Sequence, residues 1–165
     1  MENILKDALE FKIGDLLRAQ AQTLATAESC TGGLIADRIT DIPGSSNYFV
    51  GGIVAYANSV KIHTLGVDSE TIERCGAVSR ETVLEMARGA RAELQADIAV
   101  SVSGIAGPGG GQPGKPVGVT WIGLAAADGA WARVFTWDGD RVKNKGYSAE
   151  AALQMVLDYL EGKLA

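Results

Sequence analysis

The sequence predicts an α/β fold: a three-layer α/β/α sandwich around a mixed, mostly parallel sheet, with a β-hairpin late in the chain. Two observations support this prediction. Segments with helical periodicity alternate with short apolar segments through the first part of the chain, and a hairpin pattern precedes the last helix. The 165 residues suit one domain spanning 1–165, because no internal repeat or linker divides them.

The first part of the chain predicts alternating helices and strands. In order, they are a helix over 3–20, a strand over 23–27, a helix over 34–39, a loop over 41–46, a strand over 48–56 and a short helix over 58–65. Leucine and isoleucine recur at helical spacing in the first helix. The strand segments are short, apolar and partly β-branched, and stretches rich in Gly, Pro and Ser end them.

The second part predicts two long helices, a strand and a hairpin. In order, they are a helix over 79–96, a strand over 97–103, a Gly/Pro-rich loop over 104–118, hairpin strands over 117–126 and 131–137, and a helix over 149–164. Ser79 can cap the first of these helices. The strand is apolar enough to lie in the centre of a sheet. Asp128-Gly129 is a favoured dipeptide for the hairpin turn.

Composition excludes several classes of function. The net charge is −5, and no basic run is longer than Arg141–Lys145, so neither nucleic-acid binding nor a basic membrane-surface patch is expected. No run approaches the roughly 18 apolar residues of a membrane span, and the N-terminus lacks a secretory pattern. Two cysteines make no disulfide framework, so a reducing cytoplasm is expected. The single histidine, His63, argues against a His-built metal site.

The strongest candidate for chemistry is the segment 26–33, T-A-E-S-C-T-G-G, at a strand-to-helix turn. There the Ser29 hydroxyl can face solvent beside backbone N–H groups that stabilise an oxyanion or bind a phosphate. Gly32 and Gly33 allow a ligand to approach the backbone. Two alternatives stay open: Ser29 or Thr31 is only a helix cap, and Cys30 is either the nucleophile or a small core residue.

A serine nucleophile needs a base, and Lys61 or His63 can supply it. Lys61 follows the predicted strand over 48–56, and ligand sites in open α/β sheets collect at strand ends. A lysine acts as a base only when its pKa falls towards neutrality. The alternative for both side chains is an ordinary surface position.

Two later segments are candidate ligand contacts. The strand that ends near Ser103 runs into the glycine-rich loop 104–111, which can cradle a phosphate or another ligand. This loop matches neither the dinucleotide-binding pattern nor the P-loop pattern, and a surface loop is the alternative. Residues 137–141 form a predicted turn that presents Arg141, which can clamp a phosphate or carboxylate.

Taken together, seven segments resemble the signature blocks of the CinA C-terminal family. They are T-A-E-S-C-T-G-G (26–33), I-P-G-S-S (42–46), Y-A-N-S-V-K (56–61), G-A-V-S (76–79), S-G-I-A-G-P (103–108), K-P-V-G (115–118) and G-D-R (139–141). The resemblance covers about 21–160 and is closest to the stand-alone form. It implies hydrolysis of the carboxamide of nicotinamide mononucleotide in NAD salvage, without metal or cofactor.

The resemblance also assigns site residues. It puts the nucleophile on Ser29 and its lysine partner on Lys61, places Tyr56 in the pocket, and brings the site loop to the substrate at Ser103 and Gly104. Arg141 matches the family's G-D-R. The chain departs from the family pattern over 142–146, where Lys145 stands near an expected Arg, and the two are not equivalent in bidentate phosphate binding.

The mechanism expected from these residues is a Ser-Lys amidase. Ser29 attacks the carboxamide, neutral Lys61 takes the proton, and the amides of Cys30 and Thr31 hold the oxyanion. The substrate phosphate meets Arg141 or an amide of the glycine-rich loop. The departure over 142–146 favours a rival, a non-catalytic nucleotide-binding module. A different amidase or esterase using the same serine is a second rival, and a symmetric homodimer is the expected assembly.

Overall fold

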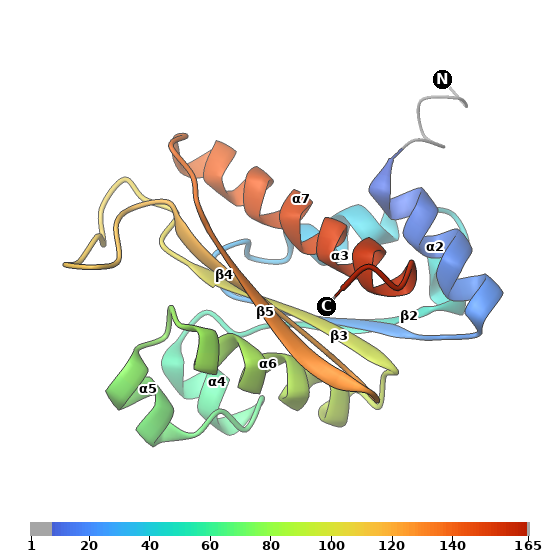
Figure 1. The fold of residues 1–165 in the computed structure, drawn as a ribbon, viewed down its shortest axis with the longest axis horizontal. Helices are drawn as coiled ribbons and strands as arrows, with labels where there is room; N and C mark the ends of the chain where they lie inside the picture. Colours follow the sequence, from blue (N-terminus) through green and yellow to red (C-terminus); the bar gives the residue numbers. More distant parts are fainter. Residues whose placement is uncertain (1–7, 165) are drawn as a thin grey trace.

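The computed structural model describes residues 8–164 as one five-stranded sheet between two layers of helices (Figure 1). The strands are β1 (Leu24–Glu28), β2 (Phe49–Val54), β3 (Ile98–Gly104), β4 (Val119–Ala126) and β5 (Gly129–Thr136). One face carries α2 (Leu9–Gln20), α3 (Leu34–Thr40) and α7 (Arg141–Leu160), and the other carries α4 (Asn58–His63), α5 (Ser69–Cys75) and α6 (Arg80–Glu93). The predicted three-layer α/β/α sandwich is confirmed.

The sheet is mixed, and its strand order is β2-β1-β3-β4-β5. β1 pairs in parallel with both β2 and β3. β4 is antiparallel to β3 and to β5, so it alone among the described strands runs against the others. The carboxyl ends of β1, β2 and β3 therefore meet at one edge of the sheet.

The connections after β1 and β2 leave that edge towards opposite faces. α3 follows β1 into one layer, whereas α4 follows β2 into the other (Figure 1). Neighbouring parallel strands whose connections diverge in this way open a crevice at their carboxyl ends, where α/β proteins bind ligands. In this chain the crevice lies between the turn 29–33 and the segment 55–61.

A buried carboxylate organises the turn from β1 to α3. Glu28 is 1% exposed at the end of β1. It accepts hydrogen bonds from Thr31 Oγ1 at 2.6 Å and from the Gly33 amide at 3.0 Å. It also accepts hydrogen bonds from the amides of Ile35 at 3.1 Å and Ala36 at 2.9 Å. These amides belong to the first turn of α3, where backbone N–H groups have no partner within the helix. Gly33 sits at φ 100°, in the left-handed region that favours glycine.

Apolar side chains fill both spaces between the sheet and its helices. The cluster under α2, α3 and α7 includes Ile13, Ile122 and Leu153, each fully buried. The cluster under α4–α6 is smaller and includes Met86 and Ala90. Burial on both faces fixes the sheet between the layers, so the carboxyl-edge turns rest on a rigid frame.

The last helix, α7, differs from the helix predicted over 149–164, because it begins earlier and takes in the end of the turn predicted at 137–141. α7 begins at Arg141, because the Asp140 side chain caps it by accepting from the Lys143 amide at 2.9 Å. Asn144 and Ser148 are buried in its first half, which the apolar periodicity of the predicted helix did not reach. Their polar atoms are satisfied by distant partners, Asn144 Nδ2 donating to Ala106 O at 3.1 Å.

Smaller differences concern α5, the hairpin and the N-terminus. α5 was not predicted, and its Asp68 cap accepts from the Glu70 amide. Ala126 pairs with Gly129, so the hairpin turn is Ala127-Asp128, one residue before the predicted dipeptide. The turn η1 (Ser45–Asn47) lies in the predicted loop 41–46. The predicted helix over 3–20 is α2 in its described part, whereas 3–7 lies outside the described residues.

Replacing the carboxylate at the β1–α3 turn tests its structural role. We expect Glu28→Gln to lower the free energy of unfolding by about 1–3 kcal/mol, because an amide nitrogen cannot accept from a backbone N–H and leaves buried donors unpaired. Chemical denaturation monitored by circular dichroism measures this. Glu93→Gln is the matched control, since Glu93 is exposed and should change stability by no more than about 0.5 kcal/mol. Equal stability of the two variants would contradict the assignment.

Candidate active site

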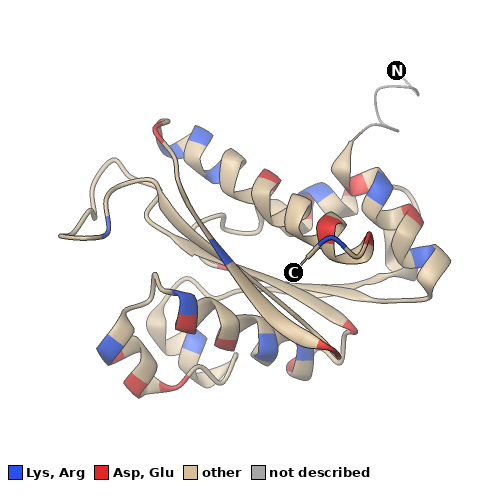
Figure 2. Cartoon of the chain, viewed as in Figure 1, with Lys and Arg blue, Asp and Glu red and all other residues tan. Residues whose placement is uncertain are grey.

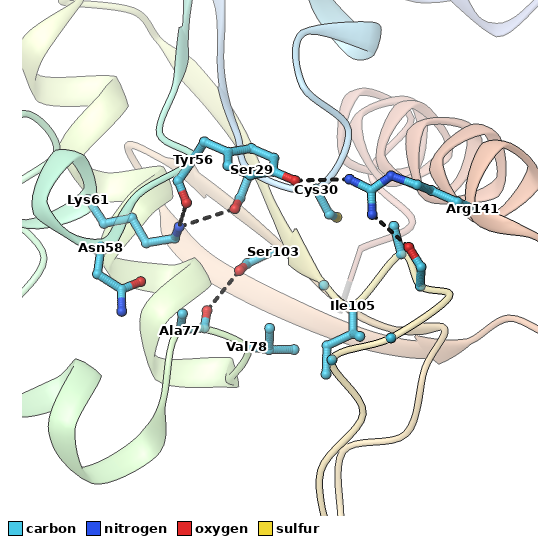
Figure 3. A pocket seen from close by; sticks show the side chains of 15 residues that line it. Ser29, Cys30, Tyr56, Asn58, Lys61, Ala77, Val78, Ser103, Ile105 and Arg141 are labelled. Carbon is cyan, nitrogen blue, oxygen red and sulfur yellow. Dashed lines mark hydrogen bonds between the residues drawn. The ribbon is translucent and has the colours of Figure 1, made fainter.

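A cavity of about 260 Å³ opens at the carboxyl edge of the parallel strands. Its walls come from the turn after β1, the β2–α4 connection, the segment before α6, the loop after β3 and the start of α7 (Figure 3). The lining residues are Ser29, Cys30, Tyr56, Asn58, Lys61, Ala77, Val78, Ser103, Gly104, Ile105, Ala106, Gly107, Gly109, Gly110 and Arg141. Most of the residues singled out from the sequence therefore share one cavity.

The central contact in this cavity joins Lys61 to Ser29. Lys61 Nζ lies 3.1 Å from Ser29 Oγ, and both side chains are buried, at 1% and 8% exposure. Figure 3 shows the lysine side chain reaching from α4 to the serine at the β1–α3 turn. The two residues lie on opposite sides of the crevice between β1 and β2, so the topology brings them together across 32 positions of sequence.

Lys61 is placed to act as a neutral base. Burial lowers the pKa of its amine, because desolvation penalises the charged form. Nζ donates to the backbone carbonyls of Ala55 at 2.8 Å and Tyr56 at 3.2 Å. A neutral amine has two N–H donors, which these carbonyls satisfy, and one lone pair, which then faces Ser29 Oγ. The geometry therefore lets Ser29 donate its proton to Lys61.

Cys30 lies in the same cavity, but its environment opposes thiolate chemistry. The side chain is 7% exposed, and burial raises the pKa of the thiol to about 11. A nucleophilic cysteine needs the opposite shift, towards a lower pKa. Of the two adjacent candidates, Ser29 is the one with a base at hydrogen-bonding distance.

The turn after Ser29 presents two backbone amides. The amides of Ser29, Gly32 and Gly33 already donate to protein acceptors. Among the described residues, none accepts from the amides of Cys30 and Thr31, the pair expected to hold an oxyanion. Unpaired N–H groups beside a nucleophile can stabilise the charge that develops in acyl transfer. Of these two residues only Cys30 lines the cavity, whereas Thr31, Gly32 and Gly33 shape the turn and lie outside the lining.

Ser103 and Gly104 line the cavity from the end of β3. The Ser103 hydroxyl donates to Ala77 O at 2.8 Å, and so ties the strand to the segment before α6. At Gly104, a Cβ would lie 2.6 Å from Thr120 Oγ1 on β4, so the neighbouring strand requires glycine there. Both residues therefore have a structural reason for their identity besides any contact with a ligand.

Arg141 spans the mouth of the cavity. Its guanidinium donates from Nη1 to Gly107 O at 2.7 Å and from Nη2 to Tyr56 Oη at 2.9 Å (Figure 3). The Tyr56 side chain is 60% exposed, so this bridge lies at the solvent side of the site. It joins the glycine-rich loop to the β2–α4 connection.

Two other candidates lie outside this lining. His63 is exposed at the end of α4 and does not line the cavity, so of the two candidate bases only Lys61 lies beside Ser29. Lys145, one turn after Arg141 on α7, has its Nζ 3.8 Å from where a Cβ at Gly32 would lie. Its charge therefore lies beside the turn that carries Ser29.

Glu28, Asn58 and the segment Ala77–Val78 lie within the signature blocks, but sequence reasoning gave them no role in the site. Glu28 directly precedes Ser29, and an acidic residue at the end of an apolar strand was the available signal. Asn58 opens α4 and lines the cavity. Ala77 and Val78 carry no chemical signal, and only the fold brings them to the site.

Charge is dispersed over the rest of the molecule. Acidic and basic residues are interspersed along α2, α5 and α6 (Figure 2). An anion would therefore be held by the few cations near the cavity rather than by a broad basic face. Within the described residues, no helix is long and apolar enough to cross a membrane.

Comparison with known proteins agrees with this geometry. The CinA C-terminal domain family matches residues 6–160. A CinA-like protein of Chloroherpeton thalassium is 50% identical over 156 residues, covering 92% of this chain and 37% of that protein. A CinA superfamily structure from Klebsiella pneumoniae superposes with a TM-score of 0.90 at 30% identity, covering 93% of this chain and 96% of that one.

A further structure, competence/damage inducible protein CihA of Agrobacterium tumefaciens, is 41% identical with a TM-score of 0.83 and covers 91% of this chain and 96% of that one. The chain spans 35% to 38% of the length of the curated relatives that it matches. The family match covers nearly the whole chain, and the structural matches reproduce its fold. The chain belongs to the CinA C-terminal domain family.

Proposed function

We propose that this domain is an amidohydrolase that converts nicotinamide mononucleotide to nicotinic acid mononucleotide and ammonia, a step in NAD salvage. The observation that carries the proposal is the 3.1 Å contact between Lys61 Nζ and Ser29 Oγ inside a cavity. A buried amine that donates to two carbonyls and faces a serine hydroxyl is suited to general-base chemistry. The choice of substrate rests on the resemblance of the signature blocks.

The first half of the reaction forms an acyl-enzyme. Ser29 Oγ attacks the carboxamide carbon while Lys61 Nζ takes the hydroxyl proton, and the carbonyl oxygen becomes an oxyanion between the amides of Cys30 and Thr31. Removing one such donor typically costs about 2.7–4 kcal/mol of transition-state stabilisation. The tetrahedral intermediate then collapses, the C–N bond breaks, and the Lys61 ammonium protonates the departing nitrogen to give ammonia.

The second half hydrolyses the ester. Water attacks the acyl carbon, and Lys61, neutral again, takes a proton from it. Collapse of the second intermediate breaks the bond to Ser29 Oγ, which recovers its proton from Lys61. The product carries a carboxyl group where the substrate carried a carboxamide. A lysine can serve in both halves only if it stays neutral in the free enzyme, which its burial favours.

Substitution of the two central residues tests the mechanism. We expect Ser29→Ala and Lys61→Met each to lower the rate of ammonia release by at least about 10³-fold, because each removes a group that acts in bond making. Cys30→Ala, the neighbouring position, should retain activity within about ten-fold. Coupled detection of ammonia with nicotinamide mononucleotide measures all three variants.

The same assay separates the rivals. Loss of activity in Cys30→Ala with retention in Ser29→Ala would move the nucleophile to the thiol. Mononucleotide binding by calorimetry without turnover by the wild type would favour the non-catalytic nucleotide-binding module. Ammonia release from other carboxamides, or ester hydrolysis, in place of mononucleotide turnover would favour a different hydrolase.

The pH dependence should report on Lys61. Because the neutral amine is the active form, we expect kcat/KM to rise with pH and then level off. The midpoint should lie below about 10.4, the ordinary pKa of lysine, since burial lowers the pKa of this amine. Lys61→Arg should stay inactive at every pH, because a guanidinium does not lose its proton in this range. A profile in which kcat/KM falls as pH rises, or one whose midpoint lies at or above about 10.4, would contradict the assignment.

A further inference from the structure

A second cavity, of about 310 Å³, adjoins the first. The residues common to the two linings are Asn58, Ala77, Val78, Ile105 and Gly110. The lining of the second cavity further includes Ile72 and Gly76, and Gln112 and Lys115 of the Gly/Pro-rich loop 104–118. It includes neither Ser29 nor Lys61, so the second cavity is a separate space that borders the first along these shared residues.

The size of the first cavity favours use of the second. Ligand pockets commonly measure about 300–1,000 Å³, and the first cavity is smaller than that range. A substrate whose carboxamide lies at Ser29 must extend its sugar and phosphate elsewhere. Two directions are open to it, past Arg141 at the mouth or across Val78 and Ile105 into the second cavity.

Lys115 gives the second cavity a cation with free donors. Its half-buried ammonium donates to Cys75 O, the last carbonyl of α5, at 2.5 Å. Within residues 8–164, no carboxylate lies within 4.0 Å of it, and no other hydrogen bond uses its remaining N–H groups. A partly desolvated ammonium without a carboxylate partner attracts an anion.

Arg141 is engaged in the bridge across the mouth of the first cavity. Two of its five N–H groups donate, one to Gly107 O and one to Tyr56 Oη, and these two contacts hold the guanidinium between the glycine-rich loop and the β2–α4 connection, while three N–H groups stay free of acceptors among the described residues. At Lys115 a phosphate would use donors that the protein leaves unpaired among its described residues.

We propose that the second cavity receives the phosphate-bearing end of the substrate, with Lys115 Nζ donating to the phosphate oxygens. Asn58 stands on the shared wall, and its side-chain amide has no protein partner among the described residues, so it can meet the sugar that links the two ends. This inference rests on the proposed amidase function, and it makes Lys115 a residue that determines specificity for phosphorylated substrates.

The test compares nicotinamide mononucleotide with nicotinamide riboside, which differ only in the phosphate. We expect Lys115→Met to lower kcat/KM for the mononucleotide by about ten- to hundred-fold, the range of a lost charge-assisted hydrogen bond, and to leave the riboside within about two-fold. Lys115→Arg should keep most of the preference. Lys143→Met is the matched control, an exposed cation that lines neither cavity and should change neither substrate.

Equal losses on both substrates would overturn the proposal, because they would make Lys115 only a structural tie to Cys75. Loss of the phosphate preference in Arg141→Met but not in Lys115→Met would overturn it as well.

Calorimetry in the Ser29→Ala background separates this inference from the amidase proposal. If the wild type releases no ammonia while Lys115→Met still weakens binding of the mononucleotide alone, the subsite stands and the amidase fails. If the mononucleotide does not bind, or binds equally with and without Lys115, the subsite is wrong.

Discussion

The site depends on the burial of one amine. Lys61 is 1% exposed, and all three atoms that it contacts by hydrogen bonding are oxygens, two of them backbone carbonyls. Burying an ammonium is costly, and carbonyl dipoles offset only part of that cost, so the neutral amine is favoured. The two carbonyl contacts engage the N–H groups of the neutral amine and leave its lone pair directed at Ser29 Oγ. The other residues that line the cavity surround Lys61 and Ser29.

On the opposite side of the crevice, Glu28 holds the Ser29 side of the contact in place. Its carboxylate accepts the first amides of α3 and the Thr31 hydroxyl, and so fixes the turn that carries Ser29. Because those amides are engaged, the amides of Cys30 and Thr31 are the ones of this turn left without an acceptor among the described residues. The carboxylate thus links the stability of the fold to the geometry of the proposed oxyanion site.

The sheet and its carboxyl edge were accessible from the sequence for a physical reason, because apolar strands with glycine-rich ends mark that edge and functional residues collect there. The pairing of Ser29 with Lys61 came only from the family resemblance, since a position near a strand end left both Lys61 and His63 as possible bases or surface residues. The start of α7 was not accessible, because Asn144 and Ser148 are polar residues buried by partners far away in sequence, such as Ala106 and Thr120. The second cavity was hidden for the same reason, since its walls meet only after folding.

The account's central claim is that Lys61 makes Ser29 nucleophilic, and covalent labelling addresses it without reference to any substrate. A fluorophosphonate probe reacts when a serine oxygen attacks phosphorus and displaces fluoride, and peptide mass spectrometry locates the adduct. The account predicts an adduct on Ser29 in the wild type and at least about 10³-fold slower labelling in Lys61→Met. Labelling of Ser29 at the same rate without Lys61, or an adduct on Cys30 in its place, would contradict it.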